Sequence, residues 1–448
     1  MRPNAYKSYL LIFLTVILAF SYIDRNVLSV VQEAIKLDLH LSDTEVGAIN
    51  GIGYAVFFSL MGIPIARWAD RGDRVAIVAI TTGVWSVAVM MCGTAGNFVQ
   101  LFLIRMGVAA GEGGCGPPAT SLIPSYFSRG ERPRAVARYL LGGYLGATVG
   151  YFLGGWLNAA YGWRRTFMIV GAPGLILAAL AALTLREPRR NRDRIGETEG
   201  VGLTLQTSNL REVLVTLYRL TTLRSVLLFY VAWYFAGWGL QLWSPTFFIR
   251  SHGLTSADVG TGFALAYGST GLLGSWWGGE LASRYASHRE RWQLIGAGAA
   301  FFLEGLCNAC AYVIPNHNVA FAAIALGNLF ESMAVGPIAA TVQTLVPPHM
   351  RATAQTLVTV LPNFLGLGLG PLAVGAMSDA FQPILGAESL RYALLILCPI
   401  YGLAAFYLWR ASVSATGELA ATLSHVEVAA TTIVVQTARH DLPTRELP

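Results

Sequence analysis

The sequence predicts an all-α membrane protein in which twelve transmembrane helices form two six-helix bundles. Hydrophobic residues make up 54% of the 448 residues, charged residues make up 12%, and the mean hydropathy is +0.53. A soluble domain carries about 25% charged residues. Runs of about 20 apolar residues, the length that crosses about 30 Å of hydrocarbon, recur along the chain. They lie at residues 8–35, 44–68, 75–94, 98–127, 135–159, 165–186, 222–250, 256–284, 292–313, 319–346, 353–378 and 390–410.

The first apolar run is expected to be a permanent span. A removable signal peptide has an apolar core of only about 7–15 residues, whereas this run is longer and a second run follows closely. With the N-terminus in the cytoplasm, 24 of the 31 Lys and Arg residues fall in cytoplasmic segments, 5 outside and 2 inside spans. This asymmetry is the positive-inside rule. We therefore expect a multi-pass inner-membrane protein with both termini cytoplasmic. The net charge of +6 is explained by this orientation, and we do not expect the protein to bind nucleic acid.

A charged segment divides the twelve spans into two groups of six. The N-terminal bundle is expected over residues 1–186 and the C-terminal bundle over 222–411. The cytoplasmic linker 187–221 begins with a run rich in arginine, and Asn209 is a suitable N-cap for a short amphipathic helix that ends at Arg219. Residues 412–448 are polar enough to form a cytoplasmic tail.

The two halves resemble each other in sequence. Each has a Gly-Pro pair in its fourth span, at Gly116-Pro117 and Gly336-Pro337. The loop after span 2 reads Asp70-Arg71-Gly72-Asp73-Arg74, and a weaker copy, Ser283-Arg284, follows span 8. Parallel repeats of six spans are typical of secondary transporters, whose substrate site lies between the halves at the midplane of the membrane.

Four ionisable residues interrupt the apolar sequence of spans 1 and 4. They are Asp24 and Arg25 in span 1, and Arg105 and Glu112 in span 4. Residues seven positions apart project to nearly the same helix face, about two turns from each other. Each charge on span 4 therefore needs a partner on another helix, and span 1 offers one acid and one base. Adjacent helical residues point about 100° apart, so Asp24 and Arg25 are expected to have different partners.

Two interpretations of these four charges remain open. One is an ion-pair lock that only holds spans 1 and 4 in register. The other is proton coupling, in which Asp24 and Glu112 take up protons when their cationic partners move away. Charges at membrane depth cost at least about 2.5 kcal/mol and usually mark a functional site. Buried ion pairs also contribute little to stability on average, which favours coupling.

Weaker candidate residues lie in spans 5, 7, 9 and 10. In span 7 the polar and aromatic side chains that could line a pocket or anchor the headgroup layer are Trp233, Tyr234, Trp238, Gln241 and Trp243. Glu331 in span 10 is a candidate for the cavity, whereas Glu304 in span 9 is expected near an interface or beside a neighbour that satisfies it. Span 5 carries a glycine at every fourth position, Gly142, Gly146, Gly150 and Gly154. This stripe favours close helix packing, and it would also permit helices to slide.

Several enzyme classes are not supported by the sequence. It contains no GxxxxGK[ST], HExxH or GxSxG motif, so an ATP-driven pump, a zinc protease and a serine hydrolase are not indicated. The five cysteines fall inside expected spans, and Cys307 and Cys310 form a single CxxC without a second ligand pair. We expect no enzyme activity, no cofactor and no metal site.

Several motifs resemble those of the major facilitator superfamily. They are the six-plus-six repeat, the loop Asp70-Arg71-Gly72-Asp73-Arg74, and Gly162-Trp163-Arg164-Arg165 before span 6. A narrower resemblance, to bacterial members of the spinster family, rests on Tyr22-Ile23-Asp24-Arg25, Leu41-Ser42-Asp43-Thr44 and Gly111-Glu112-Gly113-Gly114.

The resemblance implies proton-linked export of amphipathic lipids such as sphingosine phosphate or lysophospholipids. It implies that Asp24, Arg25, Arg105 and Glu112 occupy the charged positions of the family's cavity. It also implies that the loop motif, with Asp70, Arg71 and Arg74, helps to close the cytoplasmic side.

We therefore predict a transporter that works by alternating access, with Asp24 and Glu112 in proton coupling and with Arg25 and Arg105 available to an anionic headgroup. The expected partners are membrane lipids, protons and a small amphipathic substrate, and the protein is expected to be a monomer. An organic-anion or sugar-phosphate antiporter or facilitator of the same fold, without proton coupling, is the main alternative. A membrane receptor or sensor that does not transport is the second.

Overall fold

The structure is a computed structural model that describes residues 3–128, 130–188, 218–285, 289–345 and 361–415, together with 215, 358, 417 and 418. These residues are almost entirely helical, and no strand occurs among them. Most of the linker helix expected from Asn209 to Arg219, and most of the expected tail at 412–448, lie outside the described residues.

The N-terminal half consists of six helical elements. They are α1 (Pro3–Leu39), α2 (Asp43–Asn50), α3 (Ile52–Arg71), α4 (Arg74–Cys92), α5 (Phe98–Tyr126) and α6 (Arg132–Thr184). Side-chain caps define several starts: Ser42 forms a capping box with Glu45 at α2, and Asp73 accepts the Ala76 N–H at α4. Within α6 the chain changes direction at Gly162, whose φ of 77° is a left-handed conformation that favours glycine.

The C-terminal half repeats this pattern with more interruptions. Its elements are α9 (Thr221–His252), α10 (Ser256–Phe263), η1 (Ala264–Ser269), α11 (Thr270–Tyr285), α12 (Glu290–Val313), α13 (His317–Leu345), η2 (Asn363–Leu367), α15 (Gly368–Leu385), η3 (Gly386–Glu388) and α16 (Ser389–Leu397). A further helix covers residues 399–415. The segments η1 and η2 are π-helical, a local widening of the helix that is often found at functional sites.

The helices of the described residues account for twelve membrane crossings. Eight continuous helical stretches are long and apolar enough to span a membrane. Two of these stretches, Arg134–Thr184 and Asn363–Ala415, have 51 and 53 residues and are long enough to cross the membrane twice, so the eight stretches give ten crossings. Two more crossings come from α5, which carries the charges of span 4, and from α10, η1 and α11, which are interrupted by the π-helical segment. The twelve spans expected from the sequence therefore match the observed helices.

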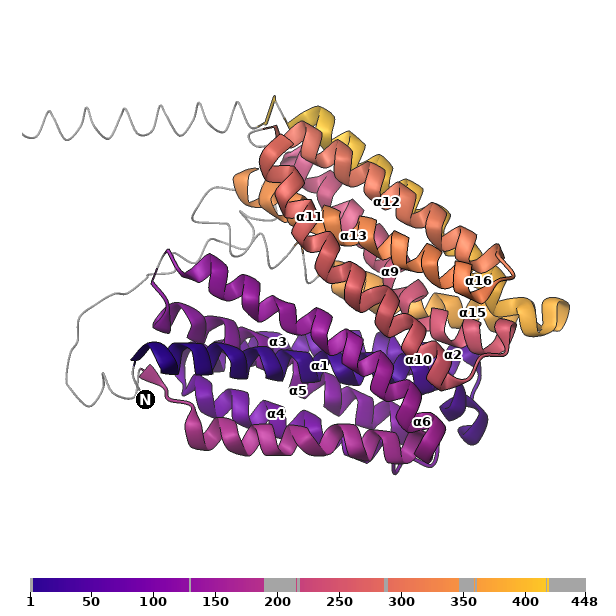
Figure 1. Cartoon of the computed structure of the whole chain (residues 1–448), viewed down its shortest axis with the longest axis horizontal. Helices are drawn as coiled ribbons and strands as arrows, with labels where there is room; N and C mark the ends of the chain where they lie inside the picture. The colour runs from indigo at the N-terminus through magenta and orange to yellow at the C-terminus, as the bar shows by residue number, and fades with distance from the viewer. Residues whose placement is uncertain are drawn as a thin grey trace, which may run out of the picture.

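The two bundles meet at one end of the molecule. They contact each other through α2 and α15, through α6 and α10, and through α1 and α9. Figure 1 shows the ribbons joined at the end where α2, α10 and α15 lie and diverging toward the end that carries the N-terminus. This arrangement leaves one side of the molecule closed by contacts between the bundles.

The glycine stripe of span 5 packs against α1 within the N-terminal bundle. A Cβ atom added to Gly146 would lie 2.2 Å from the backbone oxygen of Ala19, and one added to Gly150 would lie 2.7 Å from that of Ile23. The stripe therefore serves close packing, as expected. Because Gly150 abuts Ile23 and Asn26, this contact also fixes the turn of α1 that contains Asp24 and Arg25.

This packing predicts opposite effects for two Gly→Ala substitutions. Gly146→Ala should lower the thermal unfolding midpoint, because the new methyl group overlaps backbone and overpacking typically costs about 1–3 kcal/mol. Gly402→Ala, where an added Cβ meets nothing within 4 Å, should leave the midpoint unchanged or raise it, because alanine favours a helix by about 1 kcal/mol over glycine. Thermal unfolding of both purified variants makes the comparison, and equal midpoints would show that the stripe is not a tight contact.

Candidate functional site

The four charges of spans 1 and 4 form two crossed ion pairs. Arg105 Nη1 donates to Asp24 Oδ2 at 2.7 Å, and Arg25 Nε donates to Glu112 Oε2 at 2.9 Å. Each charge on α5 thus has its partner on α1, and the adjacent residues Asp24 and Arg25 have different partners, as predicted.

Tyr54 of α3 completes this group of residues, which we call the charge cluster: Asp24, Arg25, Tyr54, Arg105 and Glu112. The Tyr54 hydroxyl donates a hydrogen bond to Glu112 Oε2. Its ring lies 5.1 Å from the guanidinium carbon of Arg25 and 5.6 Å from that of Arg105, within the range of cation–π attraction. The sequence analysis missed Tyr54, since a single tyrosine in an apolar span carries no distinctive signal.

All residues of the charge cluster except Arg25, whose side chain is 17% exposed, are deeply buried, and some polar atoms of the cluster lack a hydrogen-bond partner among the described residues. Asp24 is 1% exposed, Arg105 2% and Glu112 4%. Among the described residues, Asp24 Oδ1, Glu112 Oε1 and Arg105 Nε have no hydrogen-bond partner. A buried polar group left unsatisfied costs about 1–3 kcal/mol, so these contacts are poorly optimised for a purely structural lock.

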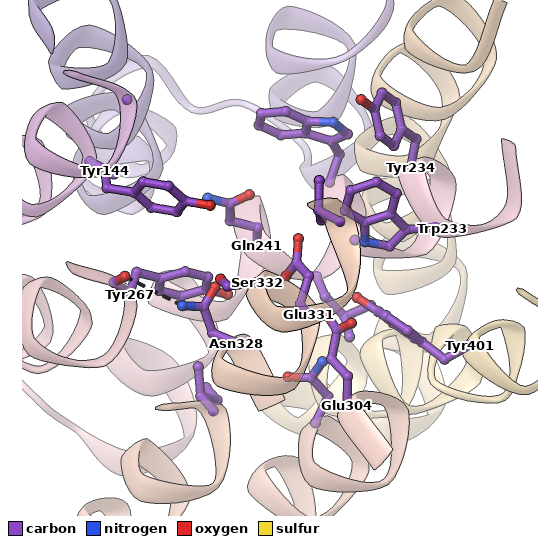
Figure 2. A pocket seen from close by; sticks show the side chains of 18 of the residues that line it. Tyr144, Trp233, Tyr234, Gln241, Tyr267, Glu304, Asn328, Glu331, Ser332 and Tyr401 are labelled. Carbon is purple, nitrogen blue, oxygen red and sulfur yellow. Dashed lines mark hydrogen bonds between the residues drawn. The ribbon is translucent and has the colours of Figure 1, made fainter. Parts of the chain in front are cut away.

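A cavity of about 590 Å³ lies between the bundles, beside the charge cluster. Its walls include Tyr22 and Tyr144 from the N-terminal half and many residues from the C-terminal half (Figure 2). The sequence-predicted residues that line it are Trp233, Tyr234, Trp238, Gln241 and Glu331. These side chains therefore face the space where a ligand could bind.

The charged residues of spans 1 and 4 do not line this cavity; they lie one layer behind its wall. The guanidinium carbon of Arg25 is 5.3 Å from the ring of Tyr22, and Tyr22 forms part of the cavity surface. Both arginines are also engaged by carboxylates. The expectation that Arg25 and Arg105 meet an anionic headgroup stays a prediction, since in this conformation each arginine is paired with a carboxylate.

An apolar cluster connects the two bundles next to the charge cluster. It contains Tyr54, Ala55 and Ala109 of the N-terminal half and Leu367 of the C-terminal half, with Trp238 packed against it. Trp238 also lines the cavity. The packing around Tyr54 therefore depends on side chains of the cavity wall and of the opposite bundle.

Glu304 lies beside neighbouring side chains, which is the second of the two positions expected for it. It lies on α12, is only 3% exposed and lines the cavity rather than a membrane interface. Its carboxyl group contacts that of Glu331 and the hydroxyl of Tyr401. Sequence reasoning also missed the cavity residues Asn308 and Asn328, although an amide in an apolar span is a signal that could have identified them.

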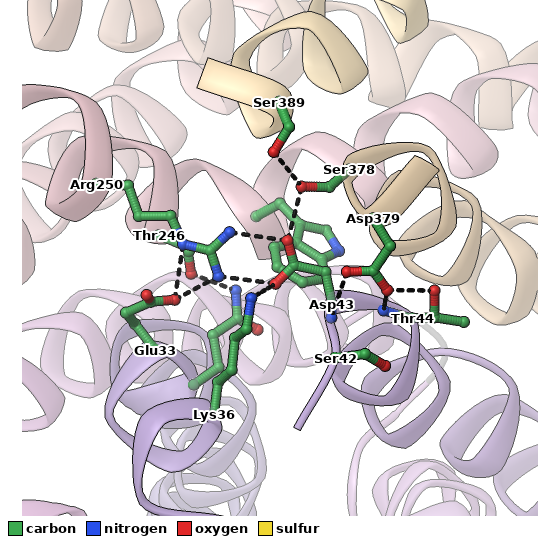
Figure 3. A network of polar contacts seen from close by, with 12 residues as sticks. Glu33, Lys36, Ser42, Asp43, Thr44, Thr246, Arg250, Ser378, Asp379 and Ser389 are labelled. Atoms are coloured by element: carbon green, nitrogen blue, oxygen red, sulfur yellow. Dashed lines mark hydrogen bonds and ion pairs between the residues drawn. The ribbon is translucent and has the colours of Figure 1, made fainter. Parts of the chain in front are cut away.

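A second polar site, which we call the interbundle network, joins the halves at their closed end (Figure 3). Arg250, in the last turn of α9, donates to Glu33 of α1 at 2.6 Å and to Asp43 of α2 at 2.8 Å. Asp43 also accepts hydrogen bonds from Lys36 Nζ and from Ser378 Oγ of α15, both at 2.6 Å. One carboxylate thereby connects elements of both bundles.

Asp379 of α15 strengthens this closure by capping α2 from the opposite bundle. Its carboxylate accepts the backbone N–H of Asp43 at 3.0 Å, and the backbone N–H and hydroxyl of Thr44 at 2.7 and 2.6 Å. An anion at a helix N-terminus is favoured by the unpaired amides and by the helix dipole. The sequence motif at residues 41–44 drew attention to α2, but its partner could not be read from it.

The loop motif after span 2 lies at the other end. Arg74 is buried and forms an ion pair and several hydrogen bonds with Glu187, which follows the end of α6. Arg71 is exposed, and the side chain of Asp70 lies outside the described residues. In this structure Arg74 therefore joins parts of the N-terminal half, and the gating role expected for the motif remains a prediction.

The chain is similar to transporters over nearly its full length. Residues 14–364 match the sequence profile of the Major Facilitator Superfamily. The chain is 32% identical over 382 residues to an "MFS-type efflux pump" of Mycolicibacterium smegmatis, which covers 84% of this chain and 86% of that protein. It is 25% identical over 415 residues to "Protein spinster homolog 1" of Xenopus tropicalis, with 88% and 78% covered.

A solved structure agrees with this similarity. The crystal structure of a bacterial homolog of the human lysosomal transporter spinster, in an inward-facing and unoccupied conformation, has a TM-score of 0.81 and 28% sequence identity with this chain. The match covers 92% of this chain and 98% of that one.

The crossed ion pairs predict strong coupling between Arg25 and Glu112. Glu112→Gln and Arg25→Met should each lower the thermal unfolding midpoint, because breaking a buried pair leaves one charge unpaired and typically costs about 3–5 kcal/mol. The double variant should lose less free energy of unfolding than the two single variants lose together. The difference, which is the coupling free energy of the pair, should be about 1–3 kcal/mol. Glu280→Gln, in an exposed pair with Arg284, is the matched control and should change stability by less than about 1 kcal/mol. Additive effects would show that the pair is not energetically linked.

Proposed function

The chain belongs to the major facilitator superfamily of transporters, and from this premise we propose that it is a proton-coupled secondary transporter that carries an amphipathic, lipid-like substrate by alternating access. The observation that carries this proposal is the charge cluster, which holds two buried carboxylates with unmet oxygens directly behind the cavity wall. Because both bundles and the cavity come from one chain, we propose that a monomer in the inner membrane is the working unit.

Proton coupling would follow from a change of partners in the charge cluster. An ionised carboxylate in a low-dielectric site is stable while an arginine or a hydroxyl compensates its charge. When that partner moves away, uptake of a proton neutralises the carboxylate and removes the desolvation cost. In this proposal Asp24 is the principal proton carrier and Glu112 the second acid. Arg25 and Arg105 control the protonation of these two acids by breaking or re-forming their ion pairs with them.

Bundle movement would reach the charge cluster through Tyr54. Asp24, Arg25, Arg105 and Glu112 all belong to the N-terminal bundle, so a rigid rotation of one bundle against the other does not by itself separate them. Tyr54, however, belongs to the apolar cluster that includes Leu367 of the opposite bundle and packs against Trp238. Loss of these contacts frees the Tyr54 ring and hydroxyl to leave Glu112, and the coupling step begins there.

The cavity suits an amphipathic molecule better than a small sugar or anion. Its wall on α9 is largely aromatic, with the rings of Tyr230, Trp233 and Tyr234 in mutual contact at centroid distances of 4.9–6.0 Å. Pockets that are mostly apolar with a few convergent polar groups orient a ligand by its polar end. We propose a substrate of the lysophospholipid or sphingoid phosphate type, with its chain along the α9 wall.

The interbundle network would act as the gate on the outer side. If the N-terminal end is cytoplasmic, as the distribution of basic residues indicates, then Arg250, Glu33, Asp43 and Asp379 close the cavity toward the outside. The described conformation is then inward-facing. Outward opening requires the ion pairs of Arg250 to break, while Asp70 and Arg71 are proposed to assist closure of the cytoplasmic side.

The proposal predicts that Asp24→Asn abolishes proton-driven transport. Liposomes containing the purified protein are given a pH gradient, and the flux of a fluorescent lysophosphatidylethanolamine is followed. Asparagine cannot carry the proton, so flux driven by the gradient should fall at least about tenfold, equivalent to about 1.4 kcal/mol, whereas exchange without a gradient should persist.

Asp38→Asn is the matched control, because Asp38 lies on the same helix in an exposed pair with Arg164. It should transport like the wild type. If Asp24→Asn keeps the full response to the gradient, Asp24 is not the carrier. A wild-type flux that ignores the gradient would instead support a facilitator.

A further inference from the structure

Two carboxyl groups meet at the cavity surface of the C-terminal bundle. Glu304 comes from α12 and Glu331 from α13, and their side chains are in contact, with the Tyr401 hydroxyl beside Glu304. Figure 2 shows the Glu331 carboxyl group in the centre of the labelled side chains. We call these two residues the acid pair.

The acid pair has no cationic partner among the described residues that line the cavity. Those lining residues include no lysine, arginine or histidine. Glu304 is 3% exposed, and its Oε2 atom has no hydrogen-bond partner among the described residues. The acid pair thus differs from the charge cluster, where each carboxylate has its own arginine.

The titratable groups around the acid pair are all phenols or thiols. Those that face Glu331 from α6, α9 and η1 are Tyr144, Tyr151, Tyr234 and Tyr267. Those that face Glu304 from α12 and the last two helical segments are Cys307, Tyr312, Cys398 and Tyr401. None of these groups supplies a positive charge. Two adjacent carboxylates cannot both be ionised cheaply, and no described residue of the cavity wall offsets the second charge, so a proton or a bound cation would stabilise the site.

Aromatic rings complete the surroundings of the acid pair. The cavity surface next to it includes Trp233, Tyr234, Tyr267 and Tyr401. The face of an aromatic ring attracts a cation, and a group of such rings is the usual way in which proteins bind alkylated ammonium groups. The amides of Asn308 and Asn328 also line the cavity. Carboxylates, aromatic faces and amide oxygens together recognise an organic ammonium group.

We propose that Glu304 and Glu331 bind the ammonium group of an amphipathic substrate and that a proton occupies the same acid pair when the substrate is absent. This inference rests on the proposed function and narrows its substrate class to amphiphiles that carry an amine. With one shared proton the acid pair has a net charge of −1. When the ammonium group binds, the proton leaves to the cavity water, and two carboxylates with one ammonium again sum to −1. The exchange therefore costs no net charge at membrane depth.

The experiment measures binding rather than transport. Purified protein in lipid nanodiscs is titrated by calorimetry with hexyltrimethylammonium, a permanent cation, and with hexyl phosphate, which has the same chain. The ammonium probe should bind to the wild type and hexyl phosphate should not. Glu331→Gln and Glu304→Gln should each weaken ammonium binding at least about tenfold, because each removes a charge-assisted contact.

Two further measurements separate a binding role from a structural one. Ammonium binding should weaken as the pH falls, since protons compete for the acid pair, and this pH dependence should be lost in the Glu304→Gln/Glu331→Gln double variant. Glu280→Gln, which changes an exposed acid of α11, should bind like the wild type. Thermal unfolding of every variant identifies any that fail to fold. If Glu331→Gln does not fold, Glu331→Asp replaces it, and this variant should bind the ammonium probe because it keeps the carboxylate.

Wild-type affinity for the ammonium probe in both glutamine variants would overturn the inference, as would preferential binding of hexyl phosphate. The outcome is distinguishable from failure of the proposed function. Glutamate-dependent ammonium binding in a protein whose Asp24→Asn variant keeps the full response to the pH gradient would refute Asp24 as the proton carrier but leave the ammonium site intact.

Discussion

A charge at membrane depth requires a partner, and this constraint governs the arrangement of the molecule. It pairs Asp24 with Arg105 and Arg25 with Glu112, and so holds α1 against α5. It also brings Arg250 of one bundle to Glu33 and Asp43 of the other. In both places desolvation offsets much of the attraction, so the ion pairs add little net stability. Such contacts can be exchanged at low cost when another partner or a proton replaces them.

The polar sites differ in what they connect. The charge cluster lies within the N-terminal bundle, the acid pair within the C-terminal bundle, and the interbundle network between the two. Only the interbundle network is broken directly by a relative rotation of the bundles. The charge cluster is affected by that rotation only through its neighbours. The apolar contact between Tyr54 and Leu367, against which Trp238 packs, connects the charge cluster to the opposite bundle. The cavity wall and the charge cluster are thereby connected through packed side chains.

Much of this organisation could be predicted from the sequence, because membrane spans and intramembrane charges leave strong local signals. The twelve spans follow from apolar runs, and the pairing of spans 1 and 4 follows from the seven-residue spacing of Arg105 and Glu112 together with charge neutrality. The position of Glu304 in the cavity beside Glu331 was not predicted, because a single acid in an apolar span does not reveal which way its helix is rotated. That rotation is set by packing of α12 against α13 and α16. Tyr54 and Asp379 were missed for a related reason, since their partners lie 58 and more than 330 residues away in the chain.

The central claim is that the carboxylates of the charge cluster change protonation when the bundles change conformation. Infrared difference spectroscopy of the purified protein tests it by comparing the wild type with Arg250→Met, in which the interbundle network is broken. Labelling of Ala147→Cys by an impermeant maleimide added only to the outside of sealed right-side-out vesicles would verify the outward opening. The opened protein should gain a carboxylic acid band, and this band should disappear when Asp24→Asn and Glu112→Gln are added. Identical carboxyl bands in the closed and opened proteins would contradict it.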